Sequence, residues 1–107
     1  MFEKLNESKL IDLLRGVDVF SNLQWIYLNN NKITDHGLKE IVSNSRKLSY
    51  VSELYLSENQ ITDQGLKVFA VSGDGFPRLK NVGLNQNQIT DEGFRAFVLN
   101  VGKFKIL

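Results

Sequence analysis

The sequence predicts an α/β solenoid of about three and a half repeats, with short parallel strands on one side and helices on the other. Two observations support this fold class. Three stretches, beginning at Leu23, Val51 and Leu79, align without gaps at a spacing of 28 residues. Each stretch has a strand-like alternation of apolar residues, followed by apolar residues at helical spacing.

The strand of each repeat is short and has one apolar face. In the first full repeat Ile26 and Leu28 alternate with Trp25, Tyr27 and Asn29, which is the period of a strand buried on one side. Strands that recur every 28 residues would stack into a parallel sheet.

An asparagine follows each strand at the same position, as Asn31, Asn59 and Asn87. Its amide has two donor hydrogens and an acceptor oxygen, and can therefore bond backbone groups that are left over where the strand ends. We expect the three amides to form a ladder along the solenoid.

A helix follows the asparagine. Thr34 or Asp35 can act as its N-cap, and Asp suits the positive end of the helix dipole. Gly37 lets the first helical turn approach its neighbours closely. The predicted return loops are 43–47 and 72–75. The apolar helix stripes are Leu38, Ile41 and Val42, then Leu66, Phe69 and Ala70, then Phe94, Phe97 and Val98.

The repeat register divides the chain into one domain, 1–107, in four parts. Residues 1–22 form the helical half of a repeat, with Leu10, Leu13, Leu14 and Phe20 at matching positions, and are expected to cap the solenoid. The full repeats are 23–50, 51–78 and 79–106.

Each full repeat reads L-x-x-L-x-L-x-x-N-x-I-T-D-x-G, with Val or Ile at some Leu positions. This pattern resembles the ribonuclease-inhibitor-like class of leucine-rich repeats. The resemblance covers nearly the whole chain, although members of the class generally have many more repeats. It implies a right-handed horseshoe with the strands on the concave side, and a mostly intracellular protein that binds other proteins along that side.

Composition narrows the classes of partner. The formal net charge of +1 gives no argument for a nucleic acid or an anionic membrane as the main partner. The chain contains no cysteine, which fits a reducing compartment, and its first residues do not resemble a signal peptide. No apolar run is long enough to span a membrane. We therefore expect a cytoplasmic protein.

The candidate partner-binding residues are the strand residues that point away from the core. Aromatic residues among them are typical of interface hot spots, and we expect Trp25, Tyr27 and Tyr55 to cluster. Alternatively, aromatic residues on a sheet face simply pack on one another. A face of three strands is small against the ~800 Å² that each partner of a standard interface buries, so a partner would also use loops or a neighbouring chain. The predicted set is Trp25, Tyr27, Asn29, Glu53, Tyr55, Ser57, Asn81 and Asn85.

No catalytic, metal or cofactor site is expected. His36 is the single histidine, at a variable helix position where we expect solvent exposure. The aspartates Asp35, Asp63 and Asp91 fit helix capping better than calcium binding, because the sequence around Asp35 lacks the glycine and the first ligands of an EF-hand loop.

Two functions fit these observations. The first is a non-catalytic protein-interaction module that binds a protein through the concave face. The alternative is an assembly element that forms a homo-oligomer through its C-terminal end, where the strand beginning at residue 79 has no following strand and Phe104 and Leu107 lack a next layer.

Overall fold

The computed structural model describes residues 6–16, 23–71, 76–101 and 105–106. Helices and strands alternate along these residues, as the sequence predicts. The elements are α1 (Glu7–Gly16), β1 (Trp25–Tyr27), α2 (Asp35–Ser43), the 3-10 helix η1 (Ser45–Leu48), β2 (Glu53–Tyr55), α3 (Asp63–Val71), β3 (Asn81–Gly83), α4 (Asp91–Val101) and β4 (Lys105–Ile106).

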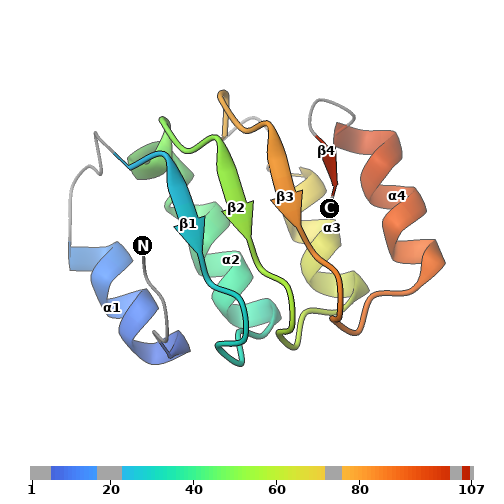
Figure 1. The fold of residues 1–107 in the computed structure, drawn as a ribbon, viewed down its shortest axis with the longest axis horizontal. Helices are drawn as coiled ribbons and strands as arrows, with labels where there is room; N and C mark the ends of the chain where they lie inside the picture. Colours follow the sequence, from blue (N-terminus) through green and yellow to red (C-terminus); the bar gives the residue numbers. More distant parts are fainter. Residues whose placement is uncertain (1–5, 17–22, 72–75, 102–104, 107) are drawn as a thin grey trace.

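The strands form one parallel sheet in the order β1-β2-β3-β4, with the helices lying together behind it (Figure 1). Ile26 lies opposite Leu54, and Leu54 opposite Val82. The first three strands therefore pair at the 28-residue spacing of the sequence, which confirms the predicted stacking of repeats.

The core lies between the sheet and the helices. Strand residues at alternate positions point into it, and Leu54 and Val82 have no exposed surface. The helices contribute most of the predicted stripe residues, including Leu38, Ile41 and Phe69, whereas the side chain of Val98 lies outside the described part of the chain. Because a single repeat is too thin to bury these side chains alone, each layer depends on the next. Phe69 shows this directly, since its ring packs edge-on against Phe97 of the following helix.

The expectation that the strand beginning at residue 79 has no following strand is wrong. β4 pairs with β3, so that Lys105 lies opposite Asn81 and Ile106 opposite Val82. This pairing joins residues 24 apart instead of 28. The last return is shorter than the sequence register implies, and it supplies partners to backbone groups at the edge of β3.

The predicted return loop 43–47 is also wrong. Ser43 is the last residue of α2, and Ser45–Leu48 forms η1. A polar side chain here provides a hydrogen-bond donor for a carbonyl in the last turn of α2. The Asn44 side-chain amide donates to the carbonyl of Glu40 at 2.8 Å. The other predicted loop, 72–75, lies outside the described residues, as do Phe20, Phe104 and Leu107.

The asparagine ladder is confirmed. The side-chain oxygen of Asn59 accepts from the backbone N–H groups of Asn31 and Ile33, both at 2.9 Å. Its amide donates to the carbonyls of Leu28 at 2.9 Å and Leu56 at 3.0 Å. The amide also donates to the carbonyl of Ser57 at 3.2 Å, so one buried side chain joins two repeats through five backbone groups.

A second set of contacts joins the starts of the helices, and we call it the threonine–carboxylate clasp. Thr62 donates its backbone N–H to Asp35 Oδ1 at 2.8 Å, and its hydroxyl donates to the other carboxylate oxygen. Thr90 makes the same two bonds to Asp63. Asp35 and Asp63 therefore each hold the threonine of the next repeat.

This contact revises the prediction for the aspartates. The N-cap of α2 is Thr34, whose hydroxyl oxygen accepts from the backbone N–H of His36. The carboxylate of Asp35 is turned to the next repeat instead, where a hydroxyl and an N–H are both available. An anion can bond both donors at once, which a neutral side chain cannot do as strongly.

The glycine of the repeat makes room for the clasp. A Cβ atom on Gly37 would lie 2.7 Å from Glu7 Oε2, and one on Gly65 or Gly93 would collide with Asp35 or Asp63 respectively. This confirms the prediction of a close approach at Gly37.

Helix α1 joins the solenoid through the same kind of contact. Glu7 occupies the aspartate position of the half-repeat, and its carboxylate accepts from the Thr34 backbone N–H at 2.6 Å. Arg15 binds Glu40 with two hydrogen bonds, at 3.1 and 2.9 Å. Leu10 and Leu14 are buried in the common core, as the register predicts.

We predict that Asn59→Ala lowers the free energy of unfolding by about 2–4 kcal/mol, because it leaves several buried backbone groups without a partner. Asn87→Ala is the matched control, since its oxygen accepts from one backbone N–H, that of Ile61. Urea unfolding followed by circular dichroism should show the larger loss for Asn59→Ala. Equal midpoints for Asn59→Ala and the unaltered protein would contradict the ladder's role.

We also predict that Thr90→Val raises the pKa of Asp63 toward its usual range. The Thr90 hydroxyl, and then its backbone N–H, hold that pKa below the ordinary value in the folded protein. A lowered folded-state pKa stabilises the fold above the unfolded-state value of about 3.9, and this stabilisation is lost as the pH falls through the folded-state value.

The stability difference between Thr90→Val and the unaltered protein should therefore be largest near neutral pH and shrink in acid. Carboxyl chemical shifts in an NMR titration give the pKa of Asp63. Thr34→Val, the same substitution in a clasp to Glu7, should leave Asp63 unchanged. An unshifted Asp63 in Thr90→Val would refute the clasp.

Candidate protein-binding face

The candidate site is the face of the sheet that points away from the helices, which we call the open sheet face. Odd-numbered strand residues point out from it, because successive side chains of a strand alternate between its two faces. Trp25 is 49% exposed and Tyr27 is 38% exposed, whereas Ile26 between them is buried. Large apolar side chains therefore lie in solvent on a sheet whose other face is a well-packed core.

Tyr27 and Tyr55 are stacked on this face. Their ring centroids lie 4.9 Å apart with the planes 8° from parallel, as expected for opposite residues of neighbouring strands. The next position in the row is Gly83, where an added Cβ would lie 3.0 Å from Cδ1 of Tyr55. The absence of a side chain on Gly83 lets the Tyr55 ring settle over β3.

Glu53 fixes the outer end of Tyr55. The Tyr55 hydroxyl donates to Glu53 Oε1, and this bond, with burial as the second cause, raises the pKa of Tyr55 to about 12. Tyr55 is therefore a neutral hydrogen-bond donor at physiological pH and is not activated as a base or nucleophile.

Polar side chains continue the face beyond the aromatic pair. Asn29 Oδ1 accepts from the backbone N–H of Ser57 at 2.8 Å, and the Ser57 hydroxyl donates to Asn85 Oδ1. Asn29 and Asn85 are exposed, whereas Ser57 is only 9% exposed. Of this row, the two asparagines are the side chains that a partner can reach.

The structure brings most of the predicted residues onto one face. Trp25 lies opposite Glu53, and Tyr27 opposite Tyr55, while Asn81 is half-buried on β3. The ring contact that the structure gives is the tyrosine pair, and a three-membered cluster that includes Trp25 stays a prediction. The face as a whole offers rigid aromatic surface beside polar groups, the combination that protein interfaces use.

His36 is exposed at the start of α2, as predicted. Within the described ranges, no three histidine, cysteine, aspartate or glutamate side chains are grouped in a way that would hold a metal ion. Among the described helices, none combines the length and the apolar character that crossing a membrane would need.

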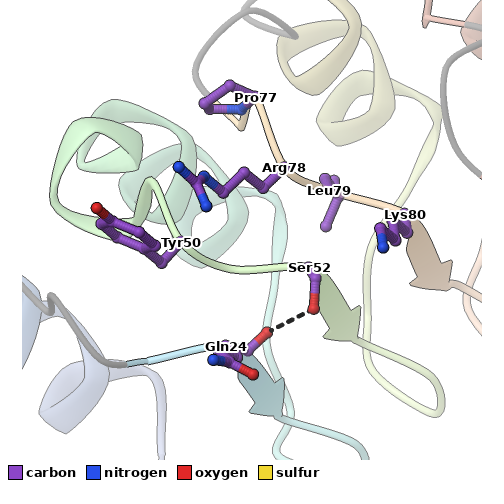
Figure 2. A pocket seen from close by; sticks show the side chains of 7 residues that line it. All are labelled: Gln24, Tyr50, Ser52, Pro77, Arg78, Leu79 and Lys80. Atoms are coloured by element: carbon purple, nitrogen blue, oxygen red, sulfur yellow. Dashed lines mark hydrogen bonds between the residues drawn. The ribbon is translucent and has the colours of Figure 1, made fainter.

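Sequence reasoning missed a pocket beside the open sheet face, at the point where the strands begin. The pocket has a volume of about 400 Å³, and Figure 2 shows the side chains around it. Nothing in the repeat pattern indicates it, because most of its residues precede the strands and differ from one repeat to the next. The lining residues are Gln24, Tyr50, Ser52, Pro77, Arg78, Leu79 and Lys80.

A parallel sheet backed by helices, with an asparagine ladder and a period of 28 residues, defines a leucine-rich-repeat protein. Two family profiles, both described as leucine-rich repeat, match the sequence, one at residues 47–70 and 79–98 and the other at residues 22–44. This chain belongs to the leucine-rich-repeat family.

Solved structures share the fold. The leiomodin-1 actin-binding site 2 matches with a TM-score of 0.80 and 13% identity over 96% of this chain. A Bacteroides fragilis protein matches with a TM-score of 0.69 and 19% identity over 90% of this chain. The matches span 64% and 28% of those two chains. No curated protein sequence matches this one.

We predict that Glu53→Gln lowers the pKa of Tyr55 from about 12 toward the ordinary value of about 10, because the charged acceptor is lost. A tyrosine pKa raised by folding stabilises the fold below the unfolded-state pKa, and that contribution disappears as the pH rises through the folded-state value. NMR of ring-labelled tyrosine at increasing pH measures the change. Lys39→Gln on α2 is the control, and equal Tyr55 titrations in Glu53→Gln and the control would be the negative result.

Proposed function

We propose that this protein is a non-catalytic interaction module that binds a protein partner through the open sheet face. Leucine-rich repeats generally mediate protein–protein interaction, and the fold of this chain is of that kind. The observation that carries the proposal is the aromatic row of this face: Trp25 and Tyr27 are exposed, and Tyr27 is stacked on the half-buried Tyr55.

The aromatic row is suited to binding because it is already ordered. Stacking restrains Tyr27, and the bond to Glu53 restrains Tyr55. Side chains that are fixed before binding lose little conformational entropy when a partner covers them, so more of the contact energy contributes to affinity. Tyr and Trp are also the residues most often found at interface hot spots.

The neighbouring polar groups give this face its specificity. Asn29 and Asn85 are exposed and their oxygens already accept bonds within the sheet, which orients their amides. An oriented amide can donate to a partner's backbone carbonyl. We propose that the partner is a protein, with no role for nucleic acid or membrane.

Three further parts of the proposal rest on other observations. The 28-residue period and the T-D-x-G segment support membership of the ribonuclease-inhibitor-like class. The lack of cysteine supports a cytoplasmic location. The leiomodin-1 segment is named as an actin-binding site, so it is an example of this fold in a protein that binds another protein.

Self-association through the C-terminal end is the weaker candidate. It depends on Phe104 and Leu107, which lie outside the described residues, and on an unpaired edge of β3. β4 occupies that edge.

A pull-down with the purified protein tests the proposal. Partners captured by the unaltered protein should be lost from a Trp25→Ala, Tyr55→Ala double variant, since hot-spot truncations cost about 2 kcal/mol or more each. The matched control is Lys39→Ala, Lys67→Ala, which alters exposed residues on helices α2 and α3. Circular dichroism of each variant verifies folding.

Quantitative mass spectrometry then compares the captured proteins. The proposal requires at least one protein that the control retains and the double variant loses. Retention of every partner by a folded double variant would exclude the open sheet face as the binding surface.

A further inference from the structure

We propose that the pocket at the strand starts binds carboxylate side chains of an acidic peptide segment, with Arg78 as the principal contact and Lys80 beside it. This site lies apart from the aromatic row of the open sheet face. It gives the chain a second binding surface, with a preference for glutamate and aspartate.

The floor of the pocket is rigid because the chain is tied across the repeats there. Ser52 donates its backbone N–H to the carbonyl of Gln24 at 2.8 Å, and Lys80 donates its backbone N–H to the carbonyl of Ser52 at 2.8 Å. The Ser52 hydroxyl also donates to the Gln24 carbonyl at 3.3 Å, the contact drawn in Figure 2. Three successive repeats thus hold the lining residues in register.

Arg78 is positioned before any ligand arrives. Its guanidinium carbon lies 4.4 Å from the centroid of the Tyr50 ring, and Figure 2 shows the side chain extended toward that ring. A guanidinium stacked on an aromatic face keeps its N–H groups free at the edge of the plane, where a carboxylate can take two of them. Tyr50 is 44% exposed, so the pair faces solvent.

The charged residues that line the pocket are all basic. Arg78 and Lys80 are both exposed and both line it, whereas none of the seven lining residues is acidic. Within the described part of the chain, neither cation forms an ion pair with a carboxylate, in contrast to Arg15, which is paired with Glu40. Two cations that line one pocket, with no acidic residue among the seven lining residues, favour an anionic ligand.

The shape of the pocket favours a peptide over a small free acid. The exposed Pro77 gives it apolar surface next to the cations, and it is open to solvent along the rim of the sheet. A peptide can place its carboxylates on Arg78 and Lys80 and its backbone or methylene groups on the apolar part. A small dicarboxylate would leave that part uncovered.

Fluorescence anisotropy at low ionic strength tests this proposal with a labelled peptide that alternates glutamate and serine. The expected result is saturable binding that a glutamine counterpart lacks. Arg78→Gln should weaken binding about tenfold, in line with the loss of charge-assisted hydrogen bonds. Tyr50→Leu, which keeps the charge but removes the ring that orients Arg78, should weaken it by a smaller factor.

Arg95→Gln is the matched control, because Arg95 is exposed on α4 and its substitution removes the same charge away from the pocket. The proposal is overturned if Arg95→Gln weakens binding as much as Arg78→Gln, if the glutamine peptide binds equally well, or if the glutamate peptide does not bind. Free succinate that binds as tightly as the peptide would overturn the peptide assignment.

The Trp25→Ala, Tyr55→Ala variant separates this proposal from the one for the open sheet face. It should bind the glutamate peptide with unchanged affinity, since neither residue lines the pocket. A loss of peptide binding in that variant, with the fold intact, would show that the peptide occupies the open sheet face and would overturn the separate site.

Discussion

The structure depends on polar side chains that reach from one repeat into the next. Apolar layers alone would attract one another without fixing their relative position, because the hydrophobic effect has no direction. The buried amide of Asn59 and the carboxylate of Asp35 supply that direction, since each bonds specific backbone groups in the adjoining repeat. These bonds set the register at which the strands pair, and so they determine which side chains are presented on the open sheet face.

Much of the fold follows from the sequence because three aligned copies of the repeat indicate the same strand, turn and helix. The strand pairing of Ile26 with Leu54, the buried helix stripes and the asparagine ladder all match the periodic pattern. The role of Asp35 could not be read from the pattern, because a Thr-Asp pair before a helix is equally compatible with local capping. The glycine that recurs two residues after each aspartate could have indicated this role, because a Cβ atom on Gly65 or Gly93 would collide with the aspartate of the preceding repeat.

The departures occur where the repetition ends or varies. The pairing of β4 with β3 differs by four residues from the 28-residue repeat. The short return before β4 occurs once in the sequence, so no second copy was available for comparison. One regular feature was missed as well: Asn30, Glu58 and Gln86 lie 28 residues apart and have positive φ angles of 58°, 59° and 59°, but their differing residue types do not reveal this shared backbone shape. The tyrosine pair followed from strand register. Arg78 and Tyr50 are also one repeat apart, but this position holds a different residue type in each repeat, so the pattern does not predict their contact.

The clasp between threonine and carboxylate has a fixed polarity, because the acid always belongs to the earlier unit and the donors to the later one. The three described clasps therefore share the same donors and the same kind of acceptor. A gene that duplicates or deletes one 28-residue unit leaves both flanking junctions chemically complete. Proteins built in this way can lengthen or shorten by whole units during evolution, while the residues displayed on the sheet diversify independently of the joints that hold them.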